Sequence, residues 1–588
     1  MNTFNRCLLS GLAVVALQPV WLLGDQPVRK PDNIAATNEA QSDRDHAAAD
    51  WLPADTVAMA QIPNVAEFRR KFAASSFGAQ ANDPAFSRFF QSVLQSISQA
   101  NDGLTLDLQQ IWQQVDGELA LGVAPDAEGR LSVIAVADFE SSAAATQMIQ
   151  RLEEQLKSEG ASLTSVQLQS QTVQSWRRDS GRELESLSYV RDGDTVLFGD
   201  RLQTLAEIYT SAARNSLSDD TTYRHVSQRV AGTGEQSGAT WFVNPSAAVA
   251  AAVGAQLSAG AGDRAVGGML DQVGLDQIRG LGGSWWLGQG GMDSVSTTYG
   301  YVDAEDPGLW EALRLPATPQ TPPLWVRDNV SLYSQMNFSV ERFAEAVKKV
   351  VDRTAGAGTY AKSIGAMRIG QSEMTVSELA QQLAGPVHIA AEIPENASDV
   401  TRQNVIVAIE VKDPQQMQSL IEQLATTAGA AESQVNGQKI FELAMDSVAE
   451  EFPGLPPLEL AVTVSEGTLM LSPNKEYLKD TIQRAGTGRS LAESPEYQRV
   501  AEQFPDQTSV INYQKQDARF EGLYEQLRSG ALPSAGLPGI AGQLLNFDFS
   551  KLPEFSQMSR YLQTTGSFIV PEPDGFRVVS FGLPPGEQ

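Results

Sequence analysis

The sequence predicts an α+β protein made of two tandem copies of one domain, each with a mostly antiparallel sheet packed by helices. Three observations predict this fold class. Segments of the first half recur in order in the second half, short β-branched runs are joined by turn dipeptides, and amphipathic stretches follow several of these runs. Strands joined by tight hairpins indicate antiparallel pairing rather than a doubly wound parallel sheet.

The clearest recurrence is a polar phrase, SLSDDTTYRHV at 216–226 and SLAESPEYQRV at 490–500. Other matches keep nearly the same separation, and their small drift is what loops of different length produce. They pair 132–152 with 404–424, 194–205 with 467–478, 52–61 with 325–334, 111–121 with 379–389, and 283–287 with 566–570. Because this period far exceeds that of a solenoid repeat, it indicates duplication of a whole domain.

The duplication sets the expected domain boundaries. At 588 residues the chain is too long for one compact core. We expect a signal peptide or N-terminal anchor at 1–24, a disordered tether at 25–50, a first α+β repeat at 51–303, a Pro-rich linker at 304–323, a second α+β repeat at 324–583 and a tail at 584–588. The tether has almost no large apolar residues, and the end of the linker, LPATPQTPP, is Pro-rich and short of apolar residues.

Local patterns predict the elements within each repeat. LSVIAVADF and NVIVAIEV are nearly continuous in apolar character and indicate buried strands, each followed by an amphipathic helix. Asn436-Gly437 and Asp192-Gly193 stand between strand-like runs, as in type I′ hairpins. The polar phrase is expected to start a helix, with Ser494 or Asp220 as the N-cap and Tyr497 and Val500 facing inward.

The composition excludes some function classes. Asp and Glu number 71 against 43 Lys and Arg, which gives a net charge of −28. Such a charge repels phosphate backbones, so we expect no nucleic-acid partner. The single cysteine, Cys7, cannot form an intrachain disulfide. The only histidines are His46, His225 and His388, which argues against a His-rich metal site.

The N-terminal stretch MNTFNRCLLSGLAVVALQPVWLLG has one basic residue, Arg6, before an apolar run. This order is typical of a secretory signal peptide, and an uncleaved anchor is the alternative. We therefore expect export to the periplasm, the envelope or the extracellular space. Membrane contact is expected only through residues 1–24, if they stay uncleaved.

No motif in the sequence carries a catalytic signature. Ser472 and Lys475 have the S-x-x-K spacing of penicillin-recognising enzymes, but the S-D-N and K-T-G partners are missing. Glu153 and Glu154 are adjacent on a predicted helix, so they point apart and suit a solvated face better than a Ca²⁺ site. We name no catalytic, cofactor-binding or metal-ligating residue, and we consider enzymatic activity the less favoured interpretation.

The best single candidate for a binding surface is the pair Trp285 and Trp286. Adjacent residues of a strand face opposite sides of a sheet, so one indole should lie in the core while the other is available for contact. Packing of the second indole under a neighbouring helix is the alternative.

Three segments carry a family resemblance: LPADT at 52–56, VGLDQIRGLGGS at 273–284 and LPEFSQMSRYL at 552–562. With them the chain resembles uncharacterised secreted or envelope-associated bacterial proteins of unknown function, which implies an exported α+β protein and supplies no site.

From all of this we expect an exported, non-catalytic protein that binds or scaffolds in the cell envelope, with an unknown envelope protein or ligand as partner. One alternative is a hydrolase that uses Asp/Glu chemistry in a cleft. Another is a membrane-anchored structural protein. A cleft with paired, desolvated carboxylates would favour the hydrolase.

Overall fold

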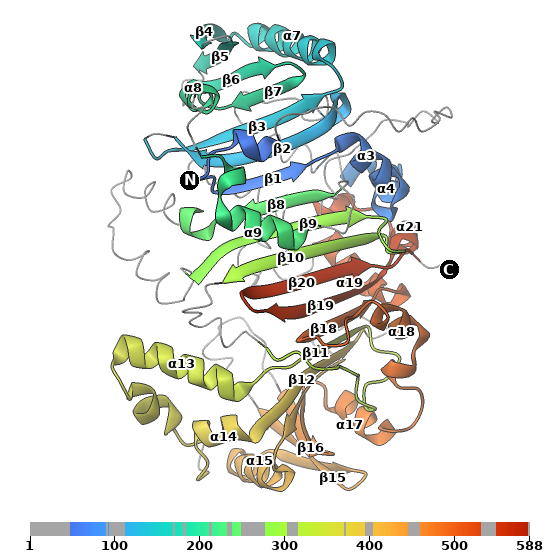
Figure 1. Ribbon diagram of the computed structural model, residues 1–588. Coiled ribbons are helices and arrows are strands. Elements are labelled where there is room, and N and C mark those ends of the chain that lie inside the picture. Colours follow the sequence, from blue (N-terminus) through green and yellow to red (C-terminus); the bar gives the residue numbers. More distant parts are fainter. Residues whose placement is uncertain are drawn as a thin grey trace. The chain divides into compact units, whose positions relative to one another are not determined.

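The computed structural model describes residues 47–89, 92, 112–126, 128–168, 171–179, 184–210, 215–231, 238–248, 277–302, 315–369, 372–393, 404–444, 459–530 and 548–585 (Figure 1). The predicted signal peptide or anchor, His46 and most of the predicted tether lie outside these residues. Within the described part of the chain, no helix has the length and apolar character needed to cross a membrane.

The chain divides into two compact units. The first comprises the described residues within 1–271, 278–301 and 537–553, and the second those within 272–277, 302–536 and 554–588.

Ten strands form the sheet of the first unit, in the spatial order β4-β5-β6-β7-β3-β2-β1-β8-β9-β10. Their bounds are β1 Ala58–Ile62, β2 Val115–Pro125, β3 Leu131–Phe139, β4 Ser162–Leu168, β5 Gln171–Asp179, β6 Leu184–Asp192, β7 Thr195–Gly199, β8 Ala239–Val243, β9 Ile278–Leu287 and β10 Ser294–Val302.

The strands of the second unit follow the same order, β14-β15-β16-β17-β13-β12-β11-β18-β19-β20, and every neighbouring pair is antiparallel. Their bounds are β11 Leu332–Met336, β12 Leu383–Glu392, β13 Asn404–Val411, β14 Ala431–Val435, β15 Gln438–Ala444, β16 Glu459–Ser465, β17 Thr468–Ser472, β18 Val510–Lys515, β19 Thr564–Glu572 and β20 Gly575–Gly582.

The predicted fold class needs a correction. We expected two tandem domains, each with its own sheet, but all twenty strands belong to one hydrogen-bonded sheet. Two separate sheets are therefore wrong. The repeated sequence identifies equivalent strands, yet it cannot tell where a sheet stops, because backbone groups of any sequence make the hydrogen bonds at a sheet edge.

Helices accompany the sheet in both units. In the first unit they are α2 Ala48–Trp51, α3 Val65–Ala74, α4 Ser76–Ala81, α7 Ser142–Ser158, α8 Leu202–Thr210, α9 Thr221–Val230 and the 3₁₀ turns η1 Leu217–Asp219 and η6 Phe549–Lys551. In the second unit they are α13 Val340–Ala355, η3 Ala361–Gly365, α14 Val376–Gln382, α15 Pro414–Ala428, α17 Lys475–Arg484, η4 Leu491–Glu493, α18 Pro495–Ala501, η5 Ala518–Phe520, α19 Glu521–Ser529, α21 Phe555–Met558 and η7 Ser559–Tyr561.

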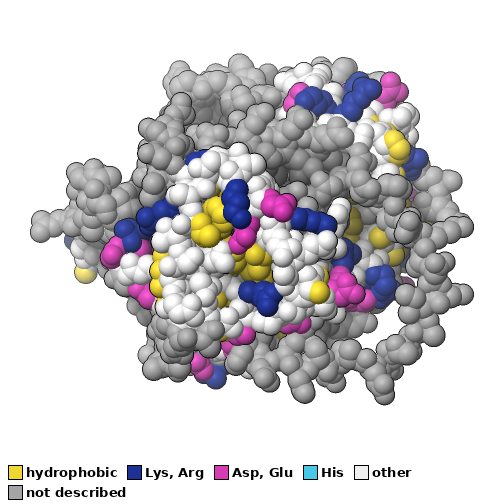
Figure 2. All heavy atoms as spheres, turned by 90° about the horizontal axis from the view of Figure 1, so that it is seen from above, with side chains coloured by type: hydrophobic (Ala, Val, Ile, Leu, Met, Phe, Trp, Pro, Cys, Tyr) yellow, Lys and Arg dark blue, Asp and Glu magenta, His cyan; other side chains and the backbone are white. Residues whose placement is uncertain are grey.

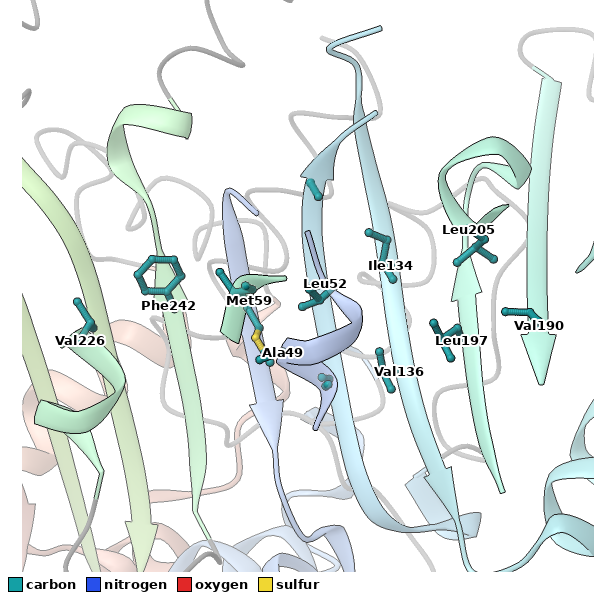
Figure 3. Packing of buried hydrophobic residues seen from close by; sticks show 14 of the residues in the cluster. Ala49, Leu52, Met59, Ile134, Val136, Val190, Leu197, Leu205, Val226 and Phe242 are labelled. Carbon is teal, nitrogen blue, oxygen red and sulfur yellow. The ribbon is translucent and has the colours of Figure 1, made fainter. Parts of the chain in front are cut away.

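Apolar side chains of strands and helices form the core of the first unit (Figure 3). Met59 of β1 and Phe242 of β8 are neighbours on one face of the sheet, and Leu52 and Val226 pack in the same cluster. In the second unit, α15 lays Met417, Leu420 and Ile421 against Phe441 and neighbouring residues of β15 to β17.

Several local predictions are confirmed. Asn436 and Gly437 both have positive φ, 49° and 81°, in the turn that joins β14 to β15. Ser494 and Asp220 cap α18 and α9, where they accept hydrogen bonds from the backbone amides of Tyr497 and Tyr223.

Candidate functional site

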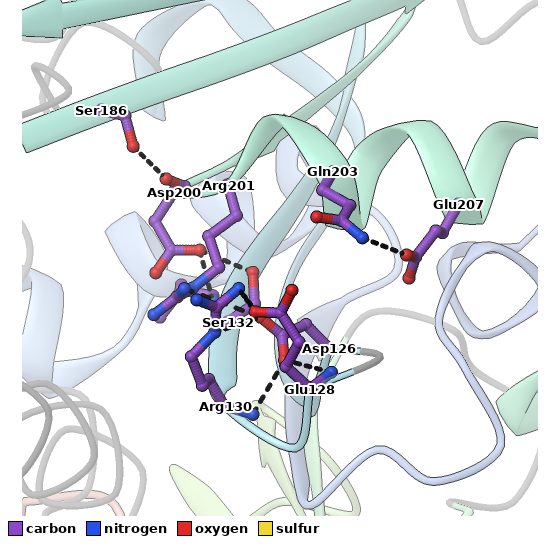
Figure 4. Close-up of polar contacts among 10 residues, drawn as sticks. Asp126, Glu128, Arg130, Ser132, Ser186, Asp200, Arg201, Gln203 and Glu207 are labelled. Carbon is purple, nitrogen blue, oxygen red and sulfur yellow. Dashed lines mark hydrogen bonds and ion pairs between the residues drawn. The ribbon is translucent and has the colours of Figure 1, made fainter.

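A polar cluster lies where the β2–β3 hairpin meets the turn from β7 into α8 (Figure 4). Its first member, Asp126, follows β2 directly. The Asp126 carboxylate accepts hydrogen bonds from the backbone amides of Glu128, at 3.0 Å, and Arg130, at 2.8 Å. Gly129 completes the turn with φ +76°. These bonds close the hairpin.

Two arginines stand beside the Asp126 carboxylate, whose side chain is only 3% exposed. Arg130 Nη2 lies 2.8 Å from Asp126 Oδ2, and Arg201 Nη1 lies 3.6 Å from the same oxygen. Burial by itself would raise the pKa of Asp126, but the hydrogen bonds from Arg130 and Glu128 outweigh it and lower that pKa. Asp126 is therefore a stable carboxylate.

The second carboxylate of the cluster, Asp200, stands at the end of β7. It accepts a hydrogen bond of 2.6 Å from Ser132 Oγ and one of 3.1 Å from the backbone amide of Val133. Burial raises the pKa of Asp200, although the bond from Ser132 and the charge of Arg201 oppose the rise. Two nearby carboxyl groups with opposite pKa shifts are the arrangement expected of a general acid and its partner.

The second unit makes the corresponding contact with neutral side chains. Asn404 is the sequence equivalent of Ser132, and its Oδ1 accepts a hydrogen bond of 2.8 Å from Asn474 Nδ2. Asn474 lies in the turn from β17 into α17 and also caps that helix. We call this contact, Ser132–Asp200 or Asn404–Asn474, the strand–turn contact. Because it forms with or without a carboxylate, its shared role is to hold the strand start against the turn.

A second candidate lies in the second unit, where a narrow crevice is bounded by residues of the segment before β11, of the sheet and of α17. Its lining is mostly apolar and includes Trp325, Val330 and Ile406, with Arg327 and Tyr477 as polar members. Drug-sized ligands usually occupy pockets of about 300–1,000 Å³, whereas the side chains here leave no enclosed space for a small molecule.

Charged groups meet at one side of this crevice. Arg327 Nη1 lies 2.7 Å from Asp480 Oδ2. Burial raises the pKa of Glu392, and the positive charges of Arg327 and Arg519 oppose that rise. Asp480 and Arg327 neutralise each other, so this ion pair offers no net charge to orient a ligand.

His388 lies behind Trp325 and is 4% exposed. Its Nδ1 is 3.0 Å from the hydroxyl of Tyr333, whose hydroxyl also donates to Gln335 Oε1 at 3.0 Å. The rings of Trp325 and His388 meet edge to face at 6.2 Å. Burial lowers the pKa of His388 to about 4, so the ring is neutral near pH 7 and lies in packed surroundings.

The two tryptophans of the predicted binding surface are buried, at 5% for Trp285 and 7% for Trp286. Trp285 packs against the rings of Phe68 and Phe77, at centroid distances of 5.6 and 5.7 Å. Trp286 Nε1 donates a hydrogen bond of 2.9 Å to Ser284 Oγ. These contacts fit the alternative of packing under helices, and the binding role of this pair stays an untested prediction.

The remaining sequence candidates also have structural contacts. Lys475 Nζ pairs with Glu442 at 2.6 Å rather than with Ser472, whose hydroxyl bonds the backbone of Asn474. Glu153 accepts a hydrogen bond from the Tyr189 hydroxyl. His225 stacks on Tyr301 at 4.2 Å. Among the described residues, no group of three or more His, Cys, Asp or Glu is arranged to hold a metal ion.

Sequence reasoning missed Asp126 and Asp200. Asp126 stands in the turn-like segment PDAEGR, and nothing in its local pattern indicates that its carboxylate is buried. The duplication held a usable signal, since Ser132 aligns with Asn404 and the turn that carries Asp200 aligns with the turn that carries Asn474. The signal is partial, because within this alignment Asp200 itself matches Pro473 and Asn474 matches Arg201, so only the strand end of the contact is polar at the same position in both copies.

Comparison with known proteins gives a family and no activity. A family described as "Protein of unknown function (DUF3352)" matches residues 24–240 and 384–537, together more than half of the chain. No curated protein matches the chain, and no solved structure matches it. The chain belongs to this family of unknown function, DUF3352.

Proposed function

We propose that this protein is an exported, non-catalytic protein that binds a partner or serves as a scaffold in the cell envelope. The observation that carries the proposal is the strand–turn contact. Asp200 is the described carboxylate that best suits acid–base chemistry, since burial raises its pKa beside an ionised Asp126. Yet Asp200 only accepts hydrogen bonds from Ser132 and Val133, and in the second unit two neutral amides, Asn404 and Asn474, join the same strand start and turn. An amide pair cannot exchange protons as a carboxyl group does, so the contact does not require acid–base chemistry.

The N-terminal pattern supports export, because a basic residue precedes an apolar run within residues 1–24. A carboxylate hydrolase is the second candidate, and one observation favours it: the opposite pKa shifts of Asp126 and Asp200. For catalysis, however, Asp200 would have to release the Ser132 hydroxyl and the Val133 amide to reach a substrate.

One experiment separates these functions. The full-length protein and its Asp200→Asn variant are assayed on chromogenic ester, peptide and glycoside substrates. The non-catalytic proposal expects no difference between the two proteins on any substrate. Turnover by the wild type that falls at least about a hundredfold in Asp200→Asn, with the fold intact by circular dichroism, would establish the hydrolase instead.

Export is tested separately by fractionating cells that express the native gene and sequencing the N-terminus of the protein. We expect the chain in the envelope, periplasmic or culture fraction. Recovery in the cytosol with an intact N-terminus contradicts the proposal.

A further inference from the structure

The edge strand β4 stands at the end of the strand order in the first unit. In the described part of the chain its hydrogen-bonded neighbour is β5, so the backbone groups on its other side have no strand partner there. Residues 162–165 and 167 are exposed, and Leu163 is 45% exposed, a high value for a leucine within a strand. A free edge of this kind can add a further strand.

Uncharged side chains line this edge. The sequence of β4 is Ser-Leu-Thr-Ser-Val-Gln-Leu, without a charged residue, proline or glycine. Charged groups on nearby elements include the opposite pairs Arg178–Glu159, at 3.0 Å, and Lys157–Glu153, at 3.7 Å, and Arg177 of β5 lies opposite Ser162 in the register of the two strands. Figure 2 views the molecule from the end at which β4 is drawn in Figure 1, and it shows basic and acidic side chains interspersed with uncharged and apolar ones.

The equivalent strand of the second unit, β14, is protected. It has five residues against seven in β4, and its Glu432 lies 3.8 Å from Lys439 on the neighbouring strand. Lys439 also pairs with Glu422 of α15 at 3.1 Å. Short length and charged side chains are what sheet proteins use to prevent edge-to-edge pairing. The edge strands β4 and β14 therefore differ in length and in charge, the two features that determine whether a sheet edge can pair with another strand.

We propose that a second copy of this chain docks antiparallel on β4, so that two β4 strands pair about a two-fold axis. The net charge of −28 opposes contact between copies over most of the surface, and β4 offers a segment where no like charges meet. A cationic partner would instead need an acidic edge, which β4 does not provide.

Pairing centred on Ser165 fits the geometry of an antiparallel sheet. A two-fold axis perpendicular to the sheet sets each residue opposite one on the same face, so Thr164 meets the second copy's Val166. Thr and Val are both β-branched, and such cross-strand pairs stabilise sheets. One strand pair buries less than the roughly 1,200–2,000 Å² of a stable interface, so the dimer is weak and depends on concentration.

Sedimentation velocity of the full-length protein over a range of concentrations tests this inference. We expect a reversible monomer–dimer equilibrium in the wild type. Ser165→Lys places two ammonium groups at the axis and should raise the dimer dissociation constant at least about tenfold. Leu163→Lys is a second variant on the same strand. The matched control is Gln434→Lys on β14, an exposed position, which should leave the equilibrium unchanged.

A cysteine variant checks the register. In a Cys7→Ser background, Ser165→Cys should give a disulfide-linked dimer on mild oxidation, because opposite residues on paired strands lie within bonding distance. Gln434→Cys should not. A monomer at every concentration overturns the inference, and so does a dimer that Ser165→Lys and Leu163→Lys leave unchanged. These outcomes do not depend on export or catalysis, so the proposed function can stand or fall separately.

Discussion

Val226 packs so closely on Gly282 that a methyl group added to this glycine would lie 2.3 Å from Cγ1 of Val226. In the second unit a methyl group on Gly566, which aligns with Gly283, would likewise lie 2.5 Å from Cγ1 of Val500 and 2.5 Å from Cζ of Phe581. The two valines end the polar phrase that the sequence repeats. Each helix α9 and α18 thus approaches its strand, β9 or β19, at a residue without a side chain, and this explains why the phrase recurs.

The first prediction tests this approach with a double-mutant cycle. Gly282→Ala should destabilise the protein by about 1–3 kcal/mol, because the added carbon overlaps Val226. Val226→Ala makes room for the added carbon. The double variant should therefore lose less unfolding free energy than the two single variants lose together, by at least about 0.5 kcal/mol. Urea unfolding measures all four proteins. Additive effects would mean that the strand moves away and that the close contact does not constrain the fold.

The second prediction concerns the leucine at the start of the repeated phrase. The backbone amide of Leu491 donates to the carbonyl of Val326 at 2.8 Å, and that of Leu217 donates to Leu52 at 2.7 Å. Leu491 and Leu217 are fully buried. Replacing either by Ala should therefore cost about 2–5 kcal/mol.

Leu324→Ala is the matched control for these variants, since Leu324 is 72% exposed. It should change the unfolding free energy by less than about 0.5 kcal/mol. Equal losses in Leu491→Ala and Leu324→Ala would show that burial does not determine the cost.

The third prediction tests whether the strand–turn contact of the first unit needs the negative charge of Asp200. Asp200→Ala should cost about 1–3 kcal/mol, since the buried Ser132 hydroxyl and the Val133 amide lose their acceptor. Asp200→Asn keeps an amide oxygen that can still accept from the Ser132 hydroxyl and the Val133 amide, and should lose less than half as much. Thermal unfolding compares the two variants. An asparagine variant as unstable as the alanine variant would show that the negative charge itself is required.

Many features of the fold are predictable from a few neighbouring residues. The features that the sequence did not predict depend on residues far apart in the chain. Asn436-Gly437 and the cap at Ser494 were predictable, because positive φ and capping are decided by a few neighbouring residues. The single sheet was not, since strand edges pair through the backbone. Asp200 escaped notice because its partner Ser132 is distant in sequence. Trp285 was ambiguous because its environment is set by Phe68 and Phe77 of other elements.

The fourth prediction is a pH dependence that His388 contributes to stability. Burial lowers the pKa of His388 in the folded protein to about 4, below its ordinary value of 6.5. The unfolded chain therefore takes up a proton at a pH where the folded ring stays neutral. The stability that the neutral ring provides is fully present above pH 6.5 and is lost as the pH falls towards 4. In that interval the loss is about 1.4 kcal/mol per pH unit, or about 3 kcal/mol in total.

The position equivalent to His388 in the first unit is Ala120. Ala120 lies opposite Gln61 in the sheet, and His388 lies opposite Gln335. His388→Ala therefore introduces the residue that the first unit has at this position. This variant should be less stable at pH 7 because the contacts with Tyr333 and Trp325 are lost. Its stability should also fall less between pH 6.5 and 4.5 than that of the wild type, since carboxylates titrate in both proteins and cancel in the difference. Urea unfolding at several pH values measures this difference, with His225→Ala as the control. Parallel curves for the wild type and His388→Ala would contradict a buried neutral histidine at this position.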